Sequence, residues 1–421
     1  METRPPKKII LDNGIKVILD EIKDRFSSAV SVWIDAGVVD ENQTNNGVSH
    51  FIEHIVFKGT KTRSSLDIAE QSEDVGANLN AFTEREHTCF HTSVLSDYAP
   101  VVIELFLDML LNPKLDEKEF ELERQVILEE IKMYKDTPED LAQDLMFEKI
   151  WKGHPVGRPI TGTIETITNL KKAQVTNCLN TLYTPDNMVI SLAGNFNEKE
   201  IMKKIEELTQ DVNKKKNKSA APPLTVNSEI FFEDKQIEQA HLCFATNGVS
   251  VYDEDRYTLA VMDIALGGGS SSRLFQEIRE KRGLAYSISS SYHTNRLGGI
   301  FGIYAGTTFK DMPVVVDLIL KEIKKVKEHG LKQEELKRAK MQLRTNLLVE
   351  LESTTVRAFR NALYELYYNH FLSPEIISQS IQSITNERIL NMANKIFDQR
   401  YFTLVVVGPE KKISKDFKLI F

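Results

Sequence analysis

The sequence predicts an α+β protein with two tandem homologous domains, each a largely antiparallel β-sheet packed with α-helices. Short apolar runs that alternate with polar residues indicate strands, and longer stretches with apolar residues at helical spacing indicate helices. The order of these elements begins again after a lysine-rich stretch that has no apolar periodicity. We therefore predict an N-terminal domain at residues 1–210, a linker at 211–228 and a C-terminal domain at 229–421.

Turn and capping residues delimit the elements of the first half. Asp12-Asn13-Gly14 separates two short strands within residues 9–20. Gly76 suits the end of a helix over 66–75, and Asn112-Pro113 closes an apolar helix over 98–111. The other predicted elements are strands at 28–36, 78–95 and 188–194 and helices at 48–57, 116–135, 142–151, 171–182 and 198–208.

The second half repeats this order. Residues 331–336 resemble 115–120, and residues 403–408 resemble 189–194, at an offset of about 215 residues. We infer a tandem duplication of a unit of about 200 residues. The predicted elements are strands at 229–246, 285–307 and 402–408 and helices at 257–266, 270–282, 313–329 and 332–351.

The composition argues against several classes of protein. The chain of 421 residues carries a net charge of −8, which disfavours a general nucleic-acid surface. No apolar run reaches the roughly 18 residues of a membrane span, and the start of the chain lacks the apolar core of a signal peptide. The 3 cysteines are widely spaced, which favours a reducing compartment. We expect a cytoplasmic protein that binds neither nucleic acid nor a membrane.

One stretch, from Val48 to Phe57, contains the residues for metal chemistry. His50, Glu53 and His54 fall at positions i, i+3 and i+4, which share one face of a helix. Two neutral imidazoles on one face suit Zn²⁺, and the carboxylate beside them can reach a metal-bound water. The flanking residues are apolar, so these groups are expected to be buried and to need partners. This H-x-x-E-H pattern, typical of inverzincins, leaves a third protein ligand to be found.

The helix over 116–135 supplies that ligand. Glu123 and Glu130 fall near the middle of its apolar wedge, where an unpaired carboxylate is costly. We predict that Glu130 is the third zinc ligand and that Glu123 steadies it or a histidine. A buried ion pair with an arginine is the alternative for Glu123. The wedge comprises Phe120, Leu122, Val126, Ile127, Ile131, Met133 and Tyr134, and the opposite side carries Glu121, Arg124, Lys132 and Lys135.

The second half has no counterpart of this metal site. The segment that matches His50 to Phe57 is Thr258 to Ala265, which contains no histidine. The second copy is therefore predicted to keep the fold without a metal. Such a domain can still close a cleft and bind substrate.

Taken together, these motifs resemble those of the pitrilysin and insulinase family of zinc metallopeptidases, which includes the mitochondrial processing peptidases and shorter bacterial relatives. The resemblance covers nearly the whole chain. It rests on the H-x-x-E-H stretch, on Asn80-Ala81-Phe82-Thr83, on Glu123 and Glu130, and on Arg279 and Tyr286.

The resemblance implies a zinc metalloendopeptidase of the bacterial type that binds one Zn²⁺ per chain. The implied ligands are His50, His54 and Glu130, with Glu123 in support. Glu53 would act as the general base that activates the water.

The resemblance also implies how substrate is held. Asn80, Ala81 and Phe82 would form an edge strand to which an extended peptide adds by main-chain hydrogen bonds. Arg279 and Tyr286 would hold substrate carbonyls and stabilise the tetrahedral intermediate. Without the family, these two residues would be interpreted as a helix-surface cation and a strand aromatic.

In the family, four such units enclose a chamber, and this chain supplies two. The resemblance therefore implies a homodimer that hydrolyses peptides or unfolded polypeptide segments. One alternative is a non-catalytic scaffold or partner subunit of the same fold, as in respiratory-complex relatives. Another is a metal-binding or metal-storage protein, which would not need Glu53 beside the water. The complete motif favours the peptidase.

Overall fold

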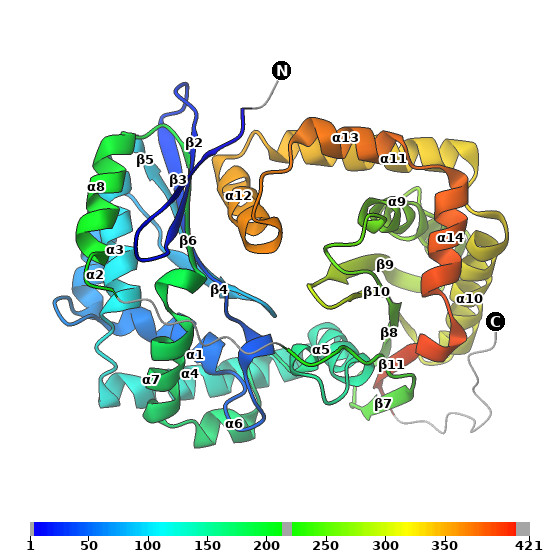
Figure 1. Ribbon diagram of the computed structural model, residues 1–421. Helices are drawn as coiled ribbons and strands as arrows, with labels where there is room; N and C mark the ends of the chain where they lie inside the picture. Colours follow the sequence, from blue (N-terminus) through cyan, green and yellow to red (C-terminus); the bar gives the residue numbers. More distant parts are fainter. Residues whose placement is uncertain (1–3, 213–220, 410–421) are drawn as a thin grey trace. The chain divides into compact units, whose positions relative to one another are not determined.

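The computed structural model describes residues 4–212 and 221–409, which form two compact units (Figure 1). The first unit takes its described residues from 1–132, 158–221 and 349–373, and the second from 133–157, 222–348 and 374–421. Within the predicted linker at 211–228, residues 213–220 lie outside the described residues. Each unit contains one β-sheet with helices on both faces.

The sheet of the first unit has six strands in the order β1-β2-β6-β3-β5-β4. Only β2 and β6 run parallel, and the other neighbours are antiparallel. Strand β4 therefore forms one edge. The strands are β1 (Lys7–Ile10), β2 (Lys16–Glu21), β3 (Ser27–Ile34), β4 (Asn80–Thr83), β5 (Thr88–Leu95) and β6 (Met188–Gly194).

The sheet of the second unit has five strands in the order β7-β11-β8-β10-β9. This order reproduces β2-β6-β3-β5-β4, including one parallel pair, β7 with β11. The structure thus confirms the α+β class and the internal duplication. The strands are β7 (Ile230–Asp234), β8 (Gln239–Asn247), β9 (Ala285–Thr294), β10 (Gly299–Thr308) and β11 (Thr403–Gly408).

In the first unit, the main core lies between the sheet and helices of the N-terminal half, while one later helix covers the other face (Figure 1). That later helix is α12 (Thr354–Tyr368). The N-terminal helices are α1 (Val48–Ile55), α2 (Ser65–Asp74), α3 (Ala99–Leu111), α4 (Glu117–Asp136), α6 (Ile164–Asn169), α7 (Lys172–Leu182) and α8 (Glu198–Thr209).

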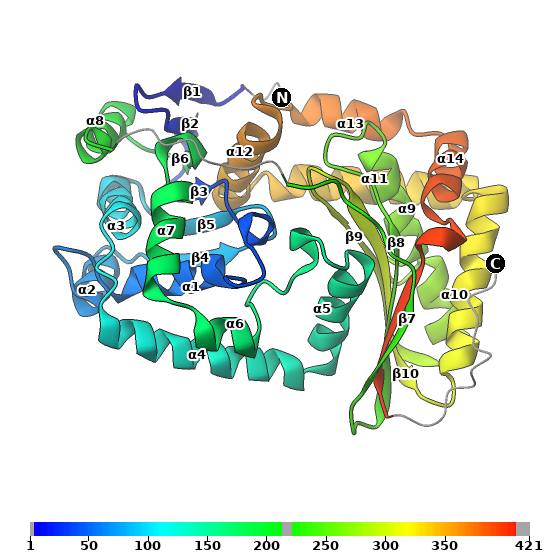
Figure 2. The same cartoon turned by 60° about the horizontal axis from the view of Figure 1, so that its bottom comes forward.

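The second unit has the corresponding arrangement (Figure 2). Helix α5 (Pro138–Ile150) packs on one face of its sheet, against β8 and β11. The helices of the C-terminal half are α9 (Arg256–Leu266), the π-helical segment η6 (Phe275–Glu280), α10 (Met312–His329), α11 (Gln333–Glu350), α13 (Pro374–Gln382) and α14 (Asn386–Ile396).

The halves of the sequence exchange two helices, α5 and α12. Helix α12 is anchored on the first sheet by buried polar contacts as well as by apolar packing. Arg357 donates two hydrogen bonds of 2.8 Å to the buried carboxylate of Asp20, and Lys8 lies 2.7 Å from the buried Glu365. Helices α6, α12, α13 and α14 are not among the elements predicted from the sequence.

The predicted apolar wedge of α4 is partly wrong. Leu122, Val126 and Met133 are about half exposed, at 50%, 49% and 60%. Arg124, predicted to face solvent, is buried because its guanidinium donates to the backbone carbonyls of Ile167, Thr168 and Leu170. These carbonyl acceptors and the Glu121 carboxylate, 2.9 Å away, compensate the buried charge. The buried face of α4 is therefore centred on Glu123, Arg124 and Ile127.

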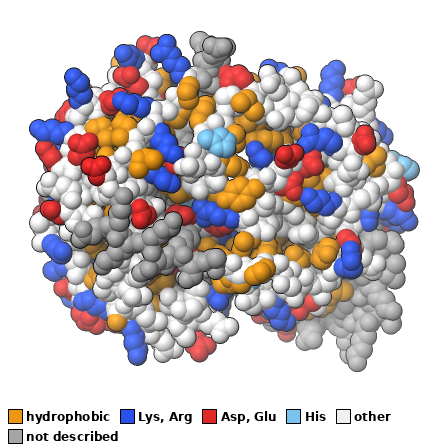
Figure 3. Space-filling view, in the orientation of Figure 1, with side chains coloured by type: hydrophobic (Ala, Val, Ile, Leu, Met, Phe, Trp, Pro, Cys, Tyr) orange, Lys and Arg blue, Asp and Glu red, His pale blue; other side chains and the backbone are white. Residues whose placement is uncertain are grey.

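Charged side chains of both signs are interspersed over the face shown in Figure 3. This mixed surface agrees with a net charge of only −8 on 421 residues. Within residues 4–212 and 221–409, every helix is too short or too polar to cross a bilayer.

Candidate metal centre

The start of α1 is fixed by a glycine and a remote carboxylate. Gly47, at the N-cap, has φ 92°, and a Cβ there would lie 2.7 Å from the carbonyl oxygen of Thr161. The buried carboxylate of Glu41 accepts hydrogen bonds from the backbone N–H groups of Gly47 (2.8 Å) and Ser49 (2.9 Å). Glu41 thus satisfies donors that a helix N-terminus leaves unpaired.

The two faces of α1 have different partners. Val48, Phe51, Ile52 and Ile55 are buried in the core, and Phe51 lies against Phe120 of α4 with ring centroids 4.5 Å apart. This packing fixes the rotation of α1. The opposite face then presents the histidines and Glu53 toward α4 and the edge strand β4.

The structure brings together His50, His54 and Glu130, each offering one ligand atom within 4.8 Å of the others. The Nε2 atoms of His50 and His54 lie 3.7 Å and 3.6 Å from the same carboxylate oxygen of Glu130. These separations are longer than hydrogen bonds. They are close to the spacing of about 3.3 Å expected between ligand atoms around a tetrahedral zinc ion. The donor set and its spacing therefore fit zinc.

Electrostatics favour neutral His50 and a basic Glu53. Burial, together with the nearby His54, lowers the pKa of His50 to about 3, which leaves its imidazole neutral and able to bind a cation. Burial raises the pKa of Glu53, although a hydrogen bond from Thr83 opposes this effect. The hydroxyl of Thr83 donates to Oε2 of Glu53 at 2.5 Å.

Glu123 lies beside the candidate ligands, and its partners are a histidine and a lysine. Its Oε2 lies 3.1 Å from Nδ1 of His54, and its Oε1 lies 2.7 Å from Nζ of Lys58. The alternative considered from the sequence, an ion pair between Glu123 and an arginine, is not observed among the described residues, because the partners of Glu123 are His54 and Lys58. Of the two partners predicted for Glu123, the zinc ligand Glu130 or a histidine, its carboxylate contacts the histidine His54, and its supporting role stays a prediction.

Asn80, Ala81 and Phe82 lie in β4, which forms an edge of the first sheet. Asn80 is exposed, and its side-chain oxygen accepts a hydrogen bond of 2.8 Å from the backbone N–H of Ala81. The ring of Phe82 packs against Trp33 on the sheet, at 5.6 Å between centroids. The edge position agrees with the predicted strand, and its binding of substrate stays a prediction.

Arg279 and Tyr286 belong to the second unit and are both exposed. The guanidinium of Arg279 lies 4.7 Å from the ring centroid of Phe275. Tyr286 is the extra residue of a β-bulge, because Ser287 pairs with Gly306 whereas Ala285 pairs with Thr307. The roles predicted for both residues stay predictions.

The phenol of Tyr286 is supported within the second unit. It hydrogen-bonds to Tyr304, whose hydroxyl lies 2.8 Å from Nδ1 of His241. The Tyr286 ring also lies against Gly306, where a Cβ would collide with it. The bulge and these contacts hold the ring in one place.

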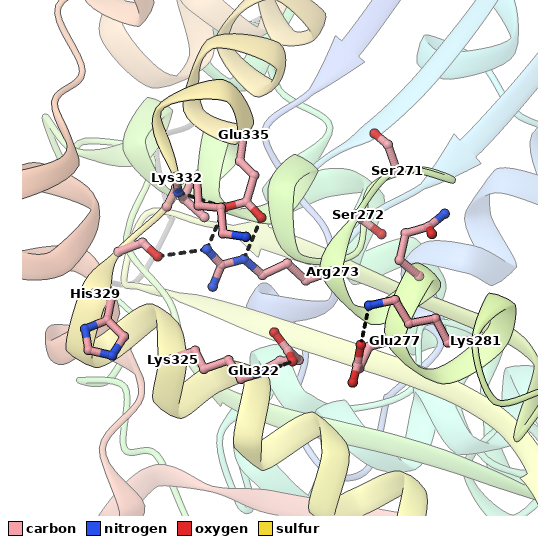
Figure 4. Close-up of a pocket in the computed structure, with 13 residues that line it drawn as sticks. Ser271, Ser272, Arg273, Glu277, Lys281, Glu322, Lys325, His329, Lys332 and Glu335 are labelled. Atoms are coloured by element: carbon pink, nitrogen blue, oxygen red, sulfur yellow. Dashed lines mark hydrogen bonds and ion pairs between the residues drawn. The ribbon is translucent and has the colours of Figure 1, made fainter.

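A cavity of about 410 Å³ lies in the second unit and contains none of the predicted site residues (Figure 4). Its three carboxylates are already paired with cations. Arg273 lies 2.6 Å from Glu335, Lys281 2.9 Å from Glu277 and Lys325 2.6 Å from Glu322. These pairs account for the negative charges of the cavity without a bound cation.

Three residues at the site were given no role from the sequence: Glu41, Lys58 and Thr83, the last of which was noted only as part of the Asn80–Thr83 motif. The signal for Lys58 was present, because it follows His54 by four residues and so shares its helix face. Glu41 and Thr83 reach α1 from a preceding loop and from a strand, and neither has such a signal.

The fold and these side chains define a two-domain α+β protein with a candidate metal centre in its first unit. Residues 16–164 match the family described as Insulinase (Peptidase family M16), and residues 169–343 match Peptidase M16 inactive domain. The chain is 34% identical over 403 residues to the uncharacterized zinc protease YmxG of Bacillus subtilis, covering 96% of this chain and 98% of that protein. The chain therefore belongs to the insulinase family, peptidase family M16, as predicted.

Solved structures share the fold at low sequence identity. A peptidase M16 inactive domain from Pseudomonas fluorescens has a TM-score of 0.88 and 20% identity, over 97% of this chain and 98% of that chain. A chain of Complex III2 from Candida albicans has a TM-score of 0.81 and 19% identity, over 96% and 95%. These similarities show the two-domain fold.

Proposed function

We propose that this protein is a zinc-dependent endopeptidase that hydrolyses peptides or unfolded polypeptide segments, with Glu53 as its general base. The observation that carries the proposal is the convergence of His50, His54 and Glu130, with the Glu53 carboxylate on the same helix face. The zinc protease names of the bacterial relatives support the same function.

His50, His54 and Glu130 would hold the zinc ion as two imidazole nitrogens and one carboxylate oxygen. Bound zinc supplies a Lewis acid that polarises a peptide carbonyl and makes water more acidic. Three protein ligands leave room for water or substrate, as catalytic zinc sites require.

Glu53 would move the proton. Burial raises the pKa of its carboxyl group, and a more basic carboxylate is a better proton acceptor. Glu53 would accept a proton from the attacking water and deliver it to the leaving amine. The hydrogen bond from Thr83 fixes one oxygen of Glu53 and leaves the other for this transfer.

The substrate would bind as an extended strand along β4, because an edge strand has unpaired backbone groups. Arg279 and Tyr286 would contribute donors to substrate carbonyls and to the developing oxyanion. A requirement for extended backbone selects peptides and unfolded segments over folded proteins.

A paired metal and peptidase measurement tests the proposal. We expect the purified protein to contain one zinc per chain and to cleave quenched fluorescent peptides, with loss of cleavage on chelation and recovery when zinc returns. Glu53→Gln should keep zinc and reduce kcat by about 10³-fold or more. Glu117→Gln, on an exposed part of α4, serves as the control and should match the wild type.

The alternative is a scaffold subunit of the same fold, since a chain of Complex III2 also has this fold. A scaffold would not require a complete set of ligands with a carboxylate base beside them. Zinc bound at one per chain without cleavage of any peptide in a diverse library would favour the scaffold over the peptidase.

A further inference from the structure

The face of α1 continues beyond the histidines to a lysine. His50, His54 and Lys58 are spaced four residues apart along α1 and the 3₁₀ turn η2 (Val56–Lys58) that extends it. Glu130 and Glu123, seven residues apart on α4, lie opposite them. Successive contacts join the two helices: His50 and His54 to Glu130, His54 to Glu123, and Glu123 to Lys58.

Glu123 is the member of this series whose charge most needs compensation, since its side chain is only 5% exposed. Its two oxygens are used differently. Oε2 faces Nδ1 of His54 at 3.1 Å, and Oε1 faces Nζ of Lys58 at 2.7 Å. Lys58 therefore fixes the rotation of the carboxylate that meets His54.

The orientation of Glu123 determines which nitrogen of His54 is free. A carboxylate at Nδ1 accepts the N–H of that nitrogen, so Nε2 carries the lone pair. Nε2 is the atom that lies 3.6 Å from Glu130, inside the candidate metal group. This arrangement is the one in which His54 can bind a cation.

We propose that Lys58 is a positioning residue of the metal centre, which acts through Glu123 to hold His54 in the orientation and tautomer that bind a divalent zinc ion. The proposal rests on the proposed zinc function. Lys58 itself touches neither metal nor substrate. Its contribution is to the affinity for zinc, and through it to the activity.

The test compares zinc dissociation constants, measured by competition with a chromophoric chelator. Lys58→Met removes the charge and keeps most of the side-chain length, and we expect it to weaken zinc binding about tenfold. Lys58→Arg keeps a cation beside Glu123 and should stay within about threefold of the wild type. Lys58→Gln provides a second uncharged variant if the methionine protein does not fold.

A matched control is available in the same unit. Lys204 pairs with Glu104 at 2.8 Å and has a side-chain exposure of 31%, close to the 33% of Lys58. It lies on α8 and belongs to no part of the metal group. Lys204→Met should leave zinc affinity unchanged, which separates a local effect at the metal centre from the general loss of an ion pair.

A double-mutant cycle tests whether Lys58 acts through Glu123. Adding Lys58→Met to Glu123→Gln should cause no further loss of zinc affinity. Full zinc affinity in Lys58→Met, or equal losses in Lys58→Met and Lys58→Arg, would overturn the proposal while leaving the zinc function intact. A wild-type protein that binds no zinc would instead overturn the proposed function and this inference with it.

Discussion

Glu53 shows how a single side chain is prepared for proton transfer. Burial alone would make its carboxyl group harder to ionise, and the Thr83 hydroxyl counters part of this effect. Thr83 is also the last residue of the edge strand β4. One hydroxyl therefore connects the strand proposed to bind substrate with the proposed base.

We predict that Thr83→Val lowers kcat about tenfold with zinc content unchanged, because valine keeps the β-branched shape but cannot hold the Glu53 carboxylate. Peptide cleavage and metal analysis of the same samples measure both quantities. Thr92→Val is the control, since Thr92 is a buried threonine of β5 that bonds a backbone carbonyl of Asn78. Wild-type turnover in Thr83→Val would mean that Glu53 is held in place by α1 alone.

In the second unit, the residue proposed to take part in the reaction through its hydroxyl is Tyr286. We predict that Tyr286→Phe lowers kcat about 10²-fold with unchanged zinc content, since it removes one donor proposed to face the oxyanion. Tyr252 has a similar exposure, 47% against 50%, and Tyr252→Phe should have no effect. Steady-state kinetics that find the same kcat in Tyr286→Phe as in the wild type would remove the residue from the proposed mechanism.

At the scale of elements, α1 depends on a carboxylate outside the helix. Glu41 is buried at its N-terminus, where backbone N–H groups favour the charged form. Burial outweighs them and raises the pKa of Glu41 from 4.5 to about 7. The folded state therefore binds a proton in a pH range where the unfolded state has lost it.

This difference makes a prediction for stability. Between pH 4.5 and about 7 the folded protein holds more protons at Glu41 than the unfolded chain, so this group's contribution to stability falls as pH rises. Glu41→Gln removes that dependence. Its melting temperature relative to the wild type should therefore increase from pH 5 to pH 8, measured by thermal unfolding with a chelator present. A constant difference across that range would contradict the prediction.

The helices that bear the candidate ligands could be predicted because each has a strong local pattern. The spacing of His50 and His54, and the acidic residues near the middle of an apolar helix face, were sufficient to select Glu130. The buried arc of α4 was partly missed. The carbonyl acceptors that bury Arg124 come from the last residues of α6 and from Leu170 at its C-cap, and no periodicity within α4 encodes them.

The exchange of α5 and α12 between the halves of the sequence could not be predicted for a similar reason. An amphipathic helix pattern specifies a buried face but not the sheet that buries it. The anchors of α12 are Asp20, Lys8 and Lys16, which pair with Arg357 and Glu365 more than 300 residues later. Such long-range pairs carry no signal in a single sequence.

At the scale of the whole molecule, we propose a homodimer, because the resemblance noted from the sequence implies four such units around a chamber and this chain has two. Light scattering should give twice the mass of one chain for the active species. An active monomer would exclude the dimer and would require Arg279 and Tyr286 to act within their own chain.

Mixing two inactive variants distinguishes action within one chain from action across the dimer. If Tyr286 serves the partner's metal centre, a mixed dimer of Glu53→Gln and Tyr286→Phe contains one site with both Glu53 and Tyr286 intact. Random exchange of subunits should then restore about a quarter of the wild-type activity, since half of the dimers are mixed and half of their sites are intact. If Tyr286 acts within its own chain, every site carries one defect and mixing restores nothing. Subunit exchange can be verified by fluorescence energy transfer between labelled chains, so a lack of recovery with complete exchange assigns Tyr286 to its own chain.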